Sequence, residues 1–303
     1  MPTPGSVQWM CPRIAPAFNR YSMDILLKPF TYEFFRNGAL AAVMLGGVCG
    51  VLGVLIVLRG MSYIGHGLSH AIFGGAAVAL ARGWNYYIAA GLWGFVSALL
   101  INQTVRRLRI SADAAIGIVT TASFALGVAV ISGMHRFTRN IEAVLFGSIL
   151  GVQRDDLLAI FVVAVGVFVT IGLFYRPLLF TTFDDETAGA FGVRTAWIDT
   201  LLSLMLAFAI IVAMNVIGVT LIAATIVIPP ITARLLTERF DRMLLLSAVL
   251  GASTSLIGIY LSYYLDTSSG ATIVLTQTAC FVLSVGFAAR RSQGHFTLPR
   301  FGG

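Results

Sequence analysis

The chain has 303 residues, of which 58% are hydrophobic and only 11% are charged, and its formal net charge is +7. Soluble domains carry about 25% charged residues, so this composition excludes a soluble globular protein and indicates a multi-pass protein surrounded by membrane lipid. The surplus of Lys and Arg lies between hydrophobic runs rather than in one patch, which follows the positive-inside rule and excludes a nucleic-acid partner.

The first twenty residues differ in composition from the rest of the chain. They contain Pro2, Pro4, Pro12 and Pro16, and they lack the basic start, apolar centre and small-residue cleavage site of a signal peptide. We expect residues 1–20 to be a disordered extension or the product of a mis-assigned start codon. The chain's cysteines are widely separated, so neither a structural disulfide nor a Cys-based zinc site is expected: Cys11, Cys49 and Cys280.

Nine hydrophobic runs approach the length of about 20 residues that a helix needs to span a bilayer. A shorter apolar segment at 141–153 is expected to be interfacial or re-entrant. The second run is rich in Gly and His and the third is short, so the prediction is an all-α integral membrane bundle of eight or nine transmembrane helices in one domain. The runs cover residues 38–58, 61–81, 86–102, 114–133, 156–175, 197–214, 217–236, 243–264 and 271–289.

Basic residues near the ends of the runs predict the orientation. The loop 237–242 and the tail 291–303 each carry or adjoin three arginines and are placed in the cytoplasm, whereas the loop 266–270 has no positive charge and is placed outside. The arginines at 106–109 put that loop inside as well. The arginine-bearing segment 136–139 then falls outside, against the rule, and the side of the N-terminus stays open.

Two histidines, His66 and His70, lie four residues apart in the second run. Ionisable side chains at membrane depth are costly and mark functional sites. The i, i+4 spacing puts both imidazoles on one helix face, where they can share an ion, and the neighbouring glycines allow another helix to approach closely. Two readings stay open: half of a metal site, completed by water or by a second copy in a dimer, or two histidines hydrogen-bonded to backbone carbonyls or Ser69.

The polar segment 183–193 lies between two runs on the cytoplasmic side. Asp184 or Thr182 can cap a short helix there, and Gly192 can end it. Such a helix is either a docking surface for a partner or a stub lying on the membrane surface. Two carboxylates follow the cap, where the helix dipole favours negative charge: Asp185 and Glu186.

Two further positions concern helix geometry. Pro229 and Pro230 lie inside the seventh run, where proline removes backbone hydrogen bonds and kinks a helix. Broken helices recur at transport pathways but also at helix ends without a function, so both readings stay open. Asp113 begins the fourth run and is expected to cap its helix.

Taken in order, these segments resemble one family, the ABC-3 membrane permeases of ATP-binding-cassette importers for zinc, manganese or iron. The resemblance runs from Leu27 to Ala289, and the order and spacing of its motifs make it specific. The motifs lie at residues 27–36, 57–70, 113–119, 145–150, 183–188, 218–223, 229–236 and 261–270.

The resemblance implies that residues 21–290 form a permease domain in the plasma membrane and that 291–303 form a cytoplasmic tail. It implies a homodimer that works with a separate cytoplasmic ABC ATPase and an extracytoplasmic metal-binding protein. The chain would catalyse no reaction and hold no permanent cofactor, only the transported divalent metal ion. His66 and His70 would contact this ion, and Pro229 and Pro230 would belong to a pathway or gating helix. The helix that docks into the ATPase, called the coupling helix below, would include Asp184, Asp185, Glu186, Ala188 and Gly192.

One departure from the family pattern bears on the choice of metal. The family usually has Asp where this chain has His66, and a neutral, softer donor favours Zn²⁺ over Mn²⁺, although the site loses charge. Two other classes of function stay open on the residues alone. A proton- or ion-coupled secondary transporter could use the His66/His70 pair as a relay. A membrane metalloenzyme would need a third ligand and a general base, and the second run contains no carboxylate.

Overall fold

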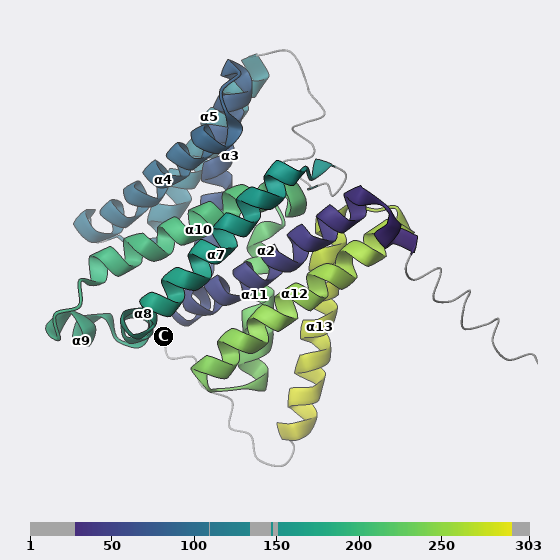
Figure 1. Ribbon diagram of the computed structural model, residues 1–303. Coiled ribbons are helices and arrows are strands. Elements are labelled where there is room, and N and C mark those ends of the chain that lie inside the picture. Colours follow the sequence, from purple (N-terminus) through teal and green to yellow (C-terminus); the bar gives the residue numbers. More distant parts are fainter. Residues whose placement is uncertain (1–27, 109, 134–146, 148–150, 293–303) are drawn as a thin grey trace, which may run out of the picture.

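The computed structural model describes residues 28–108, 110–133, 147 and 151–292, and this part of the chain is built of helices without any strand (Figure 1). The prediction of an all-α bundle is confirmed, because each of the nine hydrophobic runs lies on a helix. In chain order the helices are η1 (Lys28–Thr31), α2 (Glu33–Leu58), α3 (Ile64–Arg82), α4 (Tyr86–Leu108), α5 (Ala112–Gly133), α7 (Arg154–Leu173), α8 (Tyr175–Phe183), α9 (Asp185–Ala190), α10 (Thr195–Ile217), α11 (Ile222–Leu236), α12 (Phe240–Leu265) and α13 (Ser269–Ser292).

Seven of the described helices are long and apolar enough to cross a membrane, namely α2, α4, α5, α7, α10, α12 and α13. Helix α11 is apolar but has only 15 residues, because it begins at Ile222, five residues after the predicted start at 217. Helix α3 has 19 residues. The extension 1–20, the segment 136–139, most of 141–153 and nearly all of the tail 291–303 lie outside the described residues.

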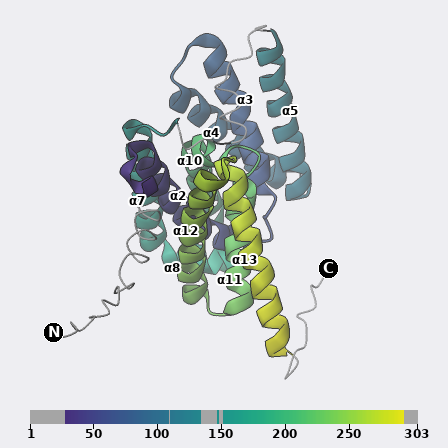
Figure 2. The same ribbon diagram turned by 90° about the vertical axis from the view of Figure 1, so that its right-hand side faces the viewer.

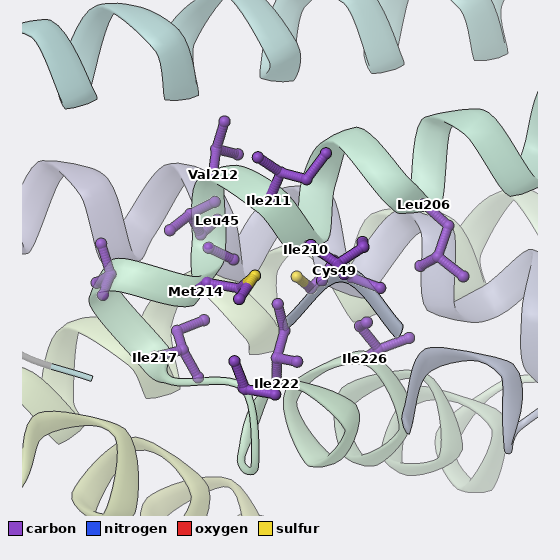
Figure 3. Close-up of a cluster of buried hydrophobic side chains, with 14 of the residues drawn as sticks. Leu45, Cys49, Leu206, Ile210, Ile211, Val212, Met214, Ile217, Ile222 and Ile226 are labelled. Atoms are coloured by element: carbon purple, nitrogen blue, oxygen red, sulfur yellow. The ribbon is translucent and has the colours of Figure 1, made fainter. Parts of the chain in front are cut away.

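Helix α2 is the central element of the bundle and packs against α12, α11, α7 and α10. Its side chains Leu45 and Cys49 meet Ile210 and Met214 of α10 and Ile226 of α11 in one buried apolar cluster (Figure 3). By contrast, α13 and α7 expose much of their apolar surface. A lipid environment accounts for that exposure, since it is as apolar as the side chains themselves.

Small residues let α2 and α12 approach backbone to backbone. A Cβ atom added to Gly46 would lie 2.3 Å from the carbonyl oxygen of Gly251, and one added to Gly50 would lie 2.4 Å from that of Ser247. The Ser247 hydroxyl donates a hydrogen bond of 2.7 Å to the carbonyl of Gly50. Spaced glycines of this kind hold membrane helices together by close packing rather than by the hydrophobic effect.

Contacts between helix ends show that α2 begins at the same end of the bundle as the loop that follows α12. The ring of Phe35, near the start of α2, lies 5.5 Å from that of Tyr263 at the end of α12. Glu33 also pairs with Arg154 at the start of α7 (Arg154 Nη2 to Glu33 Oε1, 2.8 Å). The loop 266–270 after α12 is the one that the positive-inside rule places outside. Helix α2 therefore begins at the end of the bundle that this rule predicts to be the outer end, and α8, α9 and the start of α10 lie at the opposite, inner end (Figure 1).

Candidate metal site

The two histidines lie together on α3, as their spacing predicts. Their ring centroids are 4.5 Å apart and the ring planes meet at 73°. Both side chains are partly buried. The ring of Tyr63 lies 5.4 Å from that of His66, and the ring of Phe124 on α5 lies 5.0 Å from that of His70. The pair therefore lies in a seam between α3 and α5 that is flanked by aromatic rings.

Glycines bring α3 and α5 close together at Gly67, between the two histidines, and at Gly74, one turn after His70, which confirms the predicted close approach of another helix. A Cβ atom on Gly67 would lie 2.2 Å from Cγ2 of Ile116, and one on Gly127 of α5 would lie 2.9 Å from Cα of Gly74. Helices α3, α4 and α5 contact one another and form a group at one side of the bundle (Figures 1 and 2).

The hydrogen bonds around the pair leave imidazole nitrogen available. The hydroxyl of Ser69 donates to the backbone carbonyl of His66 at 2.8 Å and not to either ring. The Nδ1 atom of His70 is buried and has no hydrogen-bond partner among the described residues. A buried polar atom in that state is costly unless a ligand or water occupies it. The described residues contain no group of three or more His, Cys, Asp or Glu side chains that could hold a metal ion, and at this seam they offer the two imidazoles.

The short helix predicted in 183–193 is present as α9, and Asp184 caps it. Oδ1 of Asp184 accepts from the backbone N–H of Thr187 at 2.9 Å, and Oδ2 accepts from the Thr187 hydroxyl at 2.5 Å. These two donors lower the pKa of Asp184. Thr182 is not the cap, because its hydroxyl donates to the carbonyl of Leu178. Gly192 follows the helix with φ +85°, the left-handed conformation that ends helices.

Helix α9 sits at the inner edge of the structure (Figure 1). Ala188 is its one buried residue, and the carboxylates of Asp185 and Glu186 lie on its exposed side. Two large apolar side chains flank it in exposed positions, Phe183 and Phe191, the latter 78% exposed. The segment therefore presents carboxylates between two phenylalanines, a surface with both charge and apolar area.

Helix α11 is continuous through Pro229 and Pro230, both of which are buried. One turn earlier, Ile226 contacts the start of the histidine helix: a Cβ atom on Gly65 would lie 3.3 Å from Cδ1 of Ile226. The carbonyl of Ile226 also lies against Gly53 of α2. The proline helix thus packs directly beside the segment that carries the histidines.

The predicted cap at Asp113 is wrong, and Ser111 caps α5 instead. The hydroxyl oxygen of Ser111 accepts from the backbone N–H of Ala114 at 3.2 Å. Helix α5 begins at Ala112, so Ser111 occupies the position before the first helical residue and Asp113 lies inside the first turn. The acidic side chain there still lies at the favourable end of the helix dipole.

Arg59, at the inner end of the bundle, has a structural role that the sequence motif 57–70 did not predict. Arg59, directly after α2, pairs with Asp199 of α10 (Nη1 to Oδ1, 2.6 Å) and its side chain is only 7% exposed. The sequence signal for this residue is a charge at the end of an apolar run. A cation that is buried there requires an ion-pair partner. Its side chain lines a hollow of about 310 Å³ together with Met61, Ile101, Asn102, Val105, Thr181, Thr182, Phe183, Asp185 and Asp199.

Comparison with known proteins agrees with this architecture. Residues 31–288 match the ABC 3 transport family. The manganese transport system membrane protein MntC of Halalkalibacterium halodurans is 38% identical over 261 residues, which cover 86% of this chain and 89% of that protein. The chelated iron transport system membrane protein YfeC of Yersinia pestis is 33% identical over 268 residues, covering 88% and 91%.

A solved structure is similar as well. The structure of PsaBC from Streptococcus pneumoniae in complex with Fab superposes on this chain with a TM-score of 0.79 at 32% sequence identity. The match covers 86% of this chain and 95% of that chain. The similarity therefore extends over nearly all of the described helices.

Proposed function

This chain belongs to the ABC 3 transport family, and from that membership we propose which ion it moves and by which residues. It is a multi-pass permease subunit of an ATP-binding-cassette importer of metal ions in the plasma membrane. It is not itself an enzyme, since ATP is hydrolysed by a separate subunit. This membership leaves the secondary-transporter and metalloenzyme alternatives without support.

The cargo we propose is a divalent transition-metal ion that His66 and His70 bind during its passage. The observation that carries this proposal is the pair of imidazoles 4.5 Å apart, with a buried Nδ1 of His70 that has no partner among the described residues. Neutral imidazole is a good ligand for such ions. Two nitrogens leave coordination positions open to water or to a second copy of the chain, and an incomplete shell allows release as well as binding.

Among divalent ions we propose a preference for Zn²⁺ over Mn²⁺. Imidazole ligands suit zinc and iron better than manganese, which prefers carboxylate, carbonyl and water oxygens. The relatives are named for manganese and iron. His66, at a position where the family usually has Asp, is the residue that would set this chain apart from them.

The partners we propose are a second copy of this chain, a cytoplasmic ABC ATPase and an extracytoplasmic metal-binding protein. The surface offered to the ATPase is α9, whose carboxylates Asp185 and Glu186 lie between the exposed rings of Phe183 and Phe191. The binding protein would deliver the ion at the outer end, where α2 begins. Movement of α9 by the ATPase would then open the seam that holds the histidines to one side and the other in turn. Pro229 and Pro230 would act within the gating helix, through its contact with α3.

Uptake in reconstituted vesicles tests this proposal. The permease, its ATPase and its binding protein are reconstituted together, and ATP-dependent uptake of zinc, iron and manganese tracers is compared for the wild type, His66→Ala, His70→Ala and His66→Asp. His295→Ala is the matched control, since it removes a histidine from the tail. We expect both α3 alanine variants to lose uptake, the control to retain it, and His66→Asp to shift preference towards manganese. Normal uptake by both alanine variants would contradict the proposal.

A further inference from the structure

The guanidinium of Arg59 joins the two chain segments that hold α9. It pairs with Asp199 at 2.6 Å, donates from Nη2 to the hydroxyl of Thr181 at 2.7 Å, and donates from Nε to the hydroxyl of Thr182 at 3.2 Å. Both threonine hydroxyls donate their own proton to backbone carbonyls of α8. Thr181 donates to the carbonyl of Pro177, and Thr182 donates to that of Leu178. Their lone pairs are therefore the atoms left to accept from a cation.

These partners flank the coupling helix on both sides. Thr181 and Thr182 lie in the last turn of α8, directly before the cap residue Asp184, and Asp199 lies in the second turn of α10, which follows α9. Among the described helices, α9 packs on α8 and α10. A displacement of α9 therefore acts on α8 and α10, the two helices to which Arg59 is hydrogen-bonded.

On its other side, Arg59 is joined to the histidine helix by a short turn closed by backbone hydrogen bonds. The N–H of Met61 donates to the carbonyl of Ile56 at 3.0 Å, and the N–H of Gly60 donates to that of Val57 at 3.1 Å. Gly60 has φ +68°. This pattern is the Schellman motif that ends α2, with Arg59 as the C-cap residue. These two bonds define the direction in which the chain leaves α2.

Helix α3 starts directly after this turn. The N–H of Ile64 donates to the carbonyl of Met61 at 2.9 Å, so the first turn of α3 continues the hydrogen-bonded chain, and His66 lies two residues further on. The path from α9 to the imidazoles thus runs through one side chain and one short hydrogen-bonded turn. The hollow of about 310 Å³ lined by Arg59, Met61 and Asp185 adjoins this path at its inner end.

We propose that Arg59 is a positioning residue that transmits the movement of α9 to α3 and so couples ATP hydrolysis to the opening of the histidine seam. This inference rests on the proposed function. It predicts a variant that still binds metal and still permits ATP hydrolysis, yet no longer converts hydrolysis into transport. A merely structural role would instead lower the amount of folded complex and leave the ratio of transport to hydrolysis unchanged.

The test measures ATP hydrolysis and Zn²⁺ uptake in the same vesicles, together with Zn²⁺ binding to the purified complex by calorimetry. Arg59→Gln removes the cation. Thr181→Val combined with Thr182→Val removes the hydrogen bonds from Arg59 to α8 and keeps its ion pair with Asp199. This double variant tests the role of Arg59 if Arg59→Gln fails to fold. Arg290→Gln is the matched control, because it removes an exposed arginine from the last turn of α13.

We expect uptake per ATP hydrolysed to fall by about tenfold in Arg59→Gln, within the range typical of coupling between sites, with Zn²⁺ binding unchanged. The double threonine variant should show a smaller fall and the control none. A wild-type ratio in both the Arg59 and the double threonine variants overturns this inference while leaving the proposed function intact. If the wild type itself shows no ATP-dependent metal uptake, the proposed function fails instead.

Discussion

The contact between α2 and α12 makes a sharp prediction about two adjacent glycines. In Gly46→Ala the new Cβ would lie 2.3 Å from the carbonyl oxygen of Gly251 and 2.6 Å from Oγ of Ser255, well inside the 3.0 Å that real Cβ contacts respect. The nearest atom is backbone and cannot rotate away, so the two helices must separate. Overpacking of this kind costs about 1–3 kcal/mol, and we expect the upper part of that range because α2 is the central helix.

The neighbouring Gly47 is the matched control for this prediction. A Cβ atom there would meet nothing closer than the carbonyl oxygen of Ala248 at 4.0 Å. Both substitutions gain the same helix propensity of about 1 kcal/mol, so that gain cancels when Gly46→Ala is compared with Gly47→Ala. The difference in the free energy of unfolding isolates the interhelical contact.

Unfolding in mixed micelles of a mild detergent and dodecyl sulfate, followed by circular dichroism, measures that difference. We expect Gly46→Ala to be less stable than Gly47→Ala by about 1–3 kcal/mol. Equal stabilities of the two variants would refute the argument, since they would mean that α2 and α12 do not approach each other backbone to backbone at this point.

Three further predictions concern other parts of the molecule. Gly67→Ala should destabilise the seam between α3 and α5 by about 1–3 kcal/mol and weaken Zn²⁺ binding, and this loss should be smaller in an Ile116→Ala background, which lacks the atom that the new Cβ meets first; a double-mutant cycle of melting temperature and calorimetry measures the coupling, and additive losses would contradict it. Asp184→Ala should weaken ATPase binding about fivefold through loss of the α9 cap, while Asp184→Asn retains binding; because hydrogen bonds from Thr187 lower the pKa of this carboxyl, the extra contribution of its charge is complete above about pH 4 and is lost as the pH falls through the lowered pKa, and pulldown across pH checks both. N-ethylmaleimide should modify Cys49 only after unfolding in dodecyl sulfate, because Cys49 is fully buried in the folded protein, and mass spectrometry showing its modification in the folded protein would contradict that burial.

The sequence predicts the helices well because a bilayer imposes a simple requirement. A spanning helix needs a long apolar run, and all nine runs lie on helices. The short α9 was equally accessible, since a capping Asp184 and a terminating Gly192 act through local backbone geometry. The adjacency of His66 and His70 follows from helix periodicity alone. The choice of Asp113 as a cap failed because helix boundaries shift by one or two residues, and here Ser111 takes the position before the first turn.

The arrangement of the helices was beyond the sequence for a physical reason. In lipid, the outside of a bundle is as apolar as its inside, so hydropathy carries no record of burial. Helices α2 and α7 have nearly equal hydropathies of 2.6 and 2.5, yet 78% of the first and 22% of the second is buried within the structure. The network around Arg59 was hidden for another reason, since its partners lie 122 to 140 residues further along the chain.

The unequal lengths of the central helices have a consequence for how the protein is made. Helix α2, with 26 residues of which only Glu33 and Arg36 are charged, can partition from the translocon into lipid without help. Helix α11, with 15 residues, is about 22 Å long and cannot cross a hydrocarbon core of about 30 Å alone. Its ends need protein rather than lipid around them. We therefore expect α11 to enter the membrane only after neighbouring helices are in place. During synthesis the bundle would then assemble around α2, and α11 would be among the last helices to integrate.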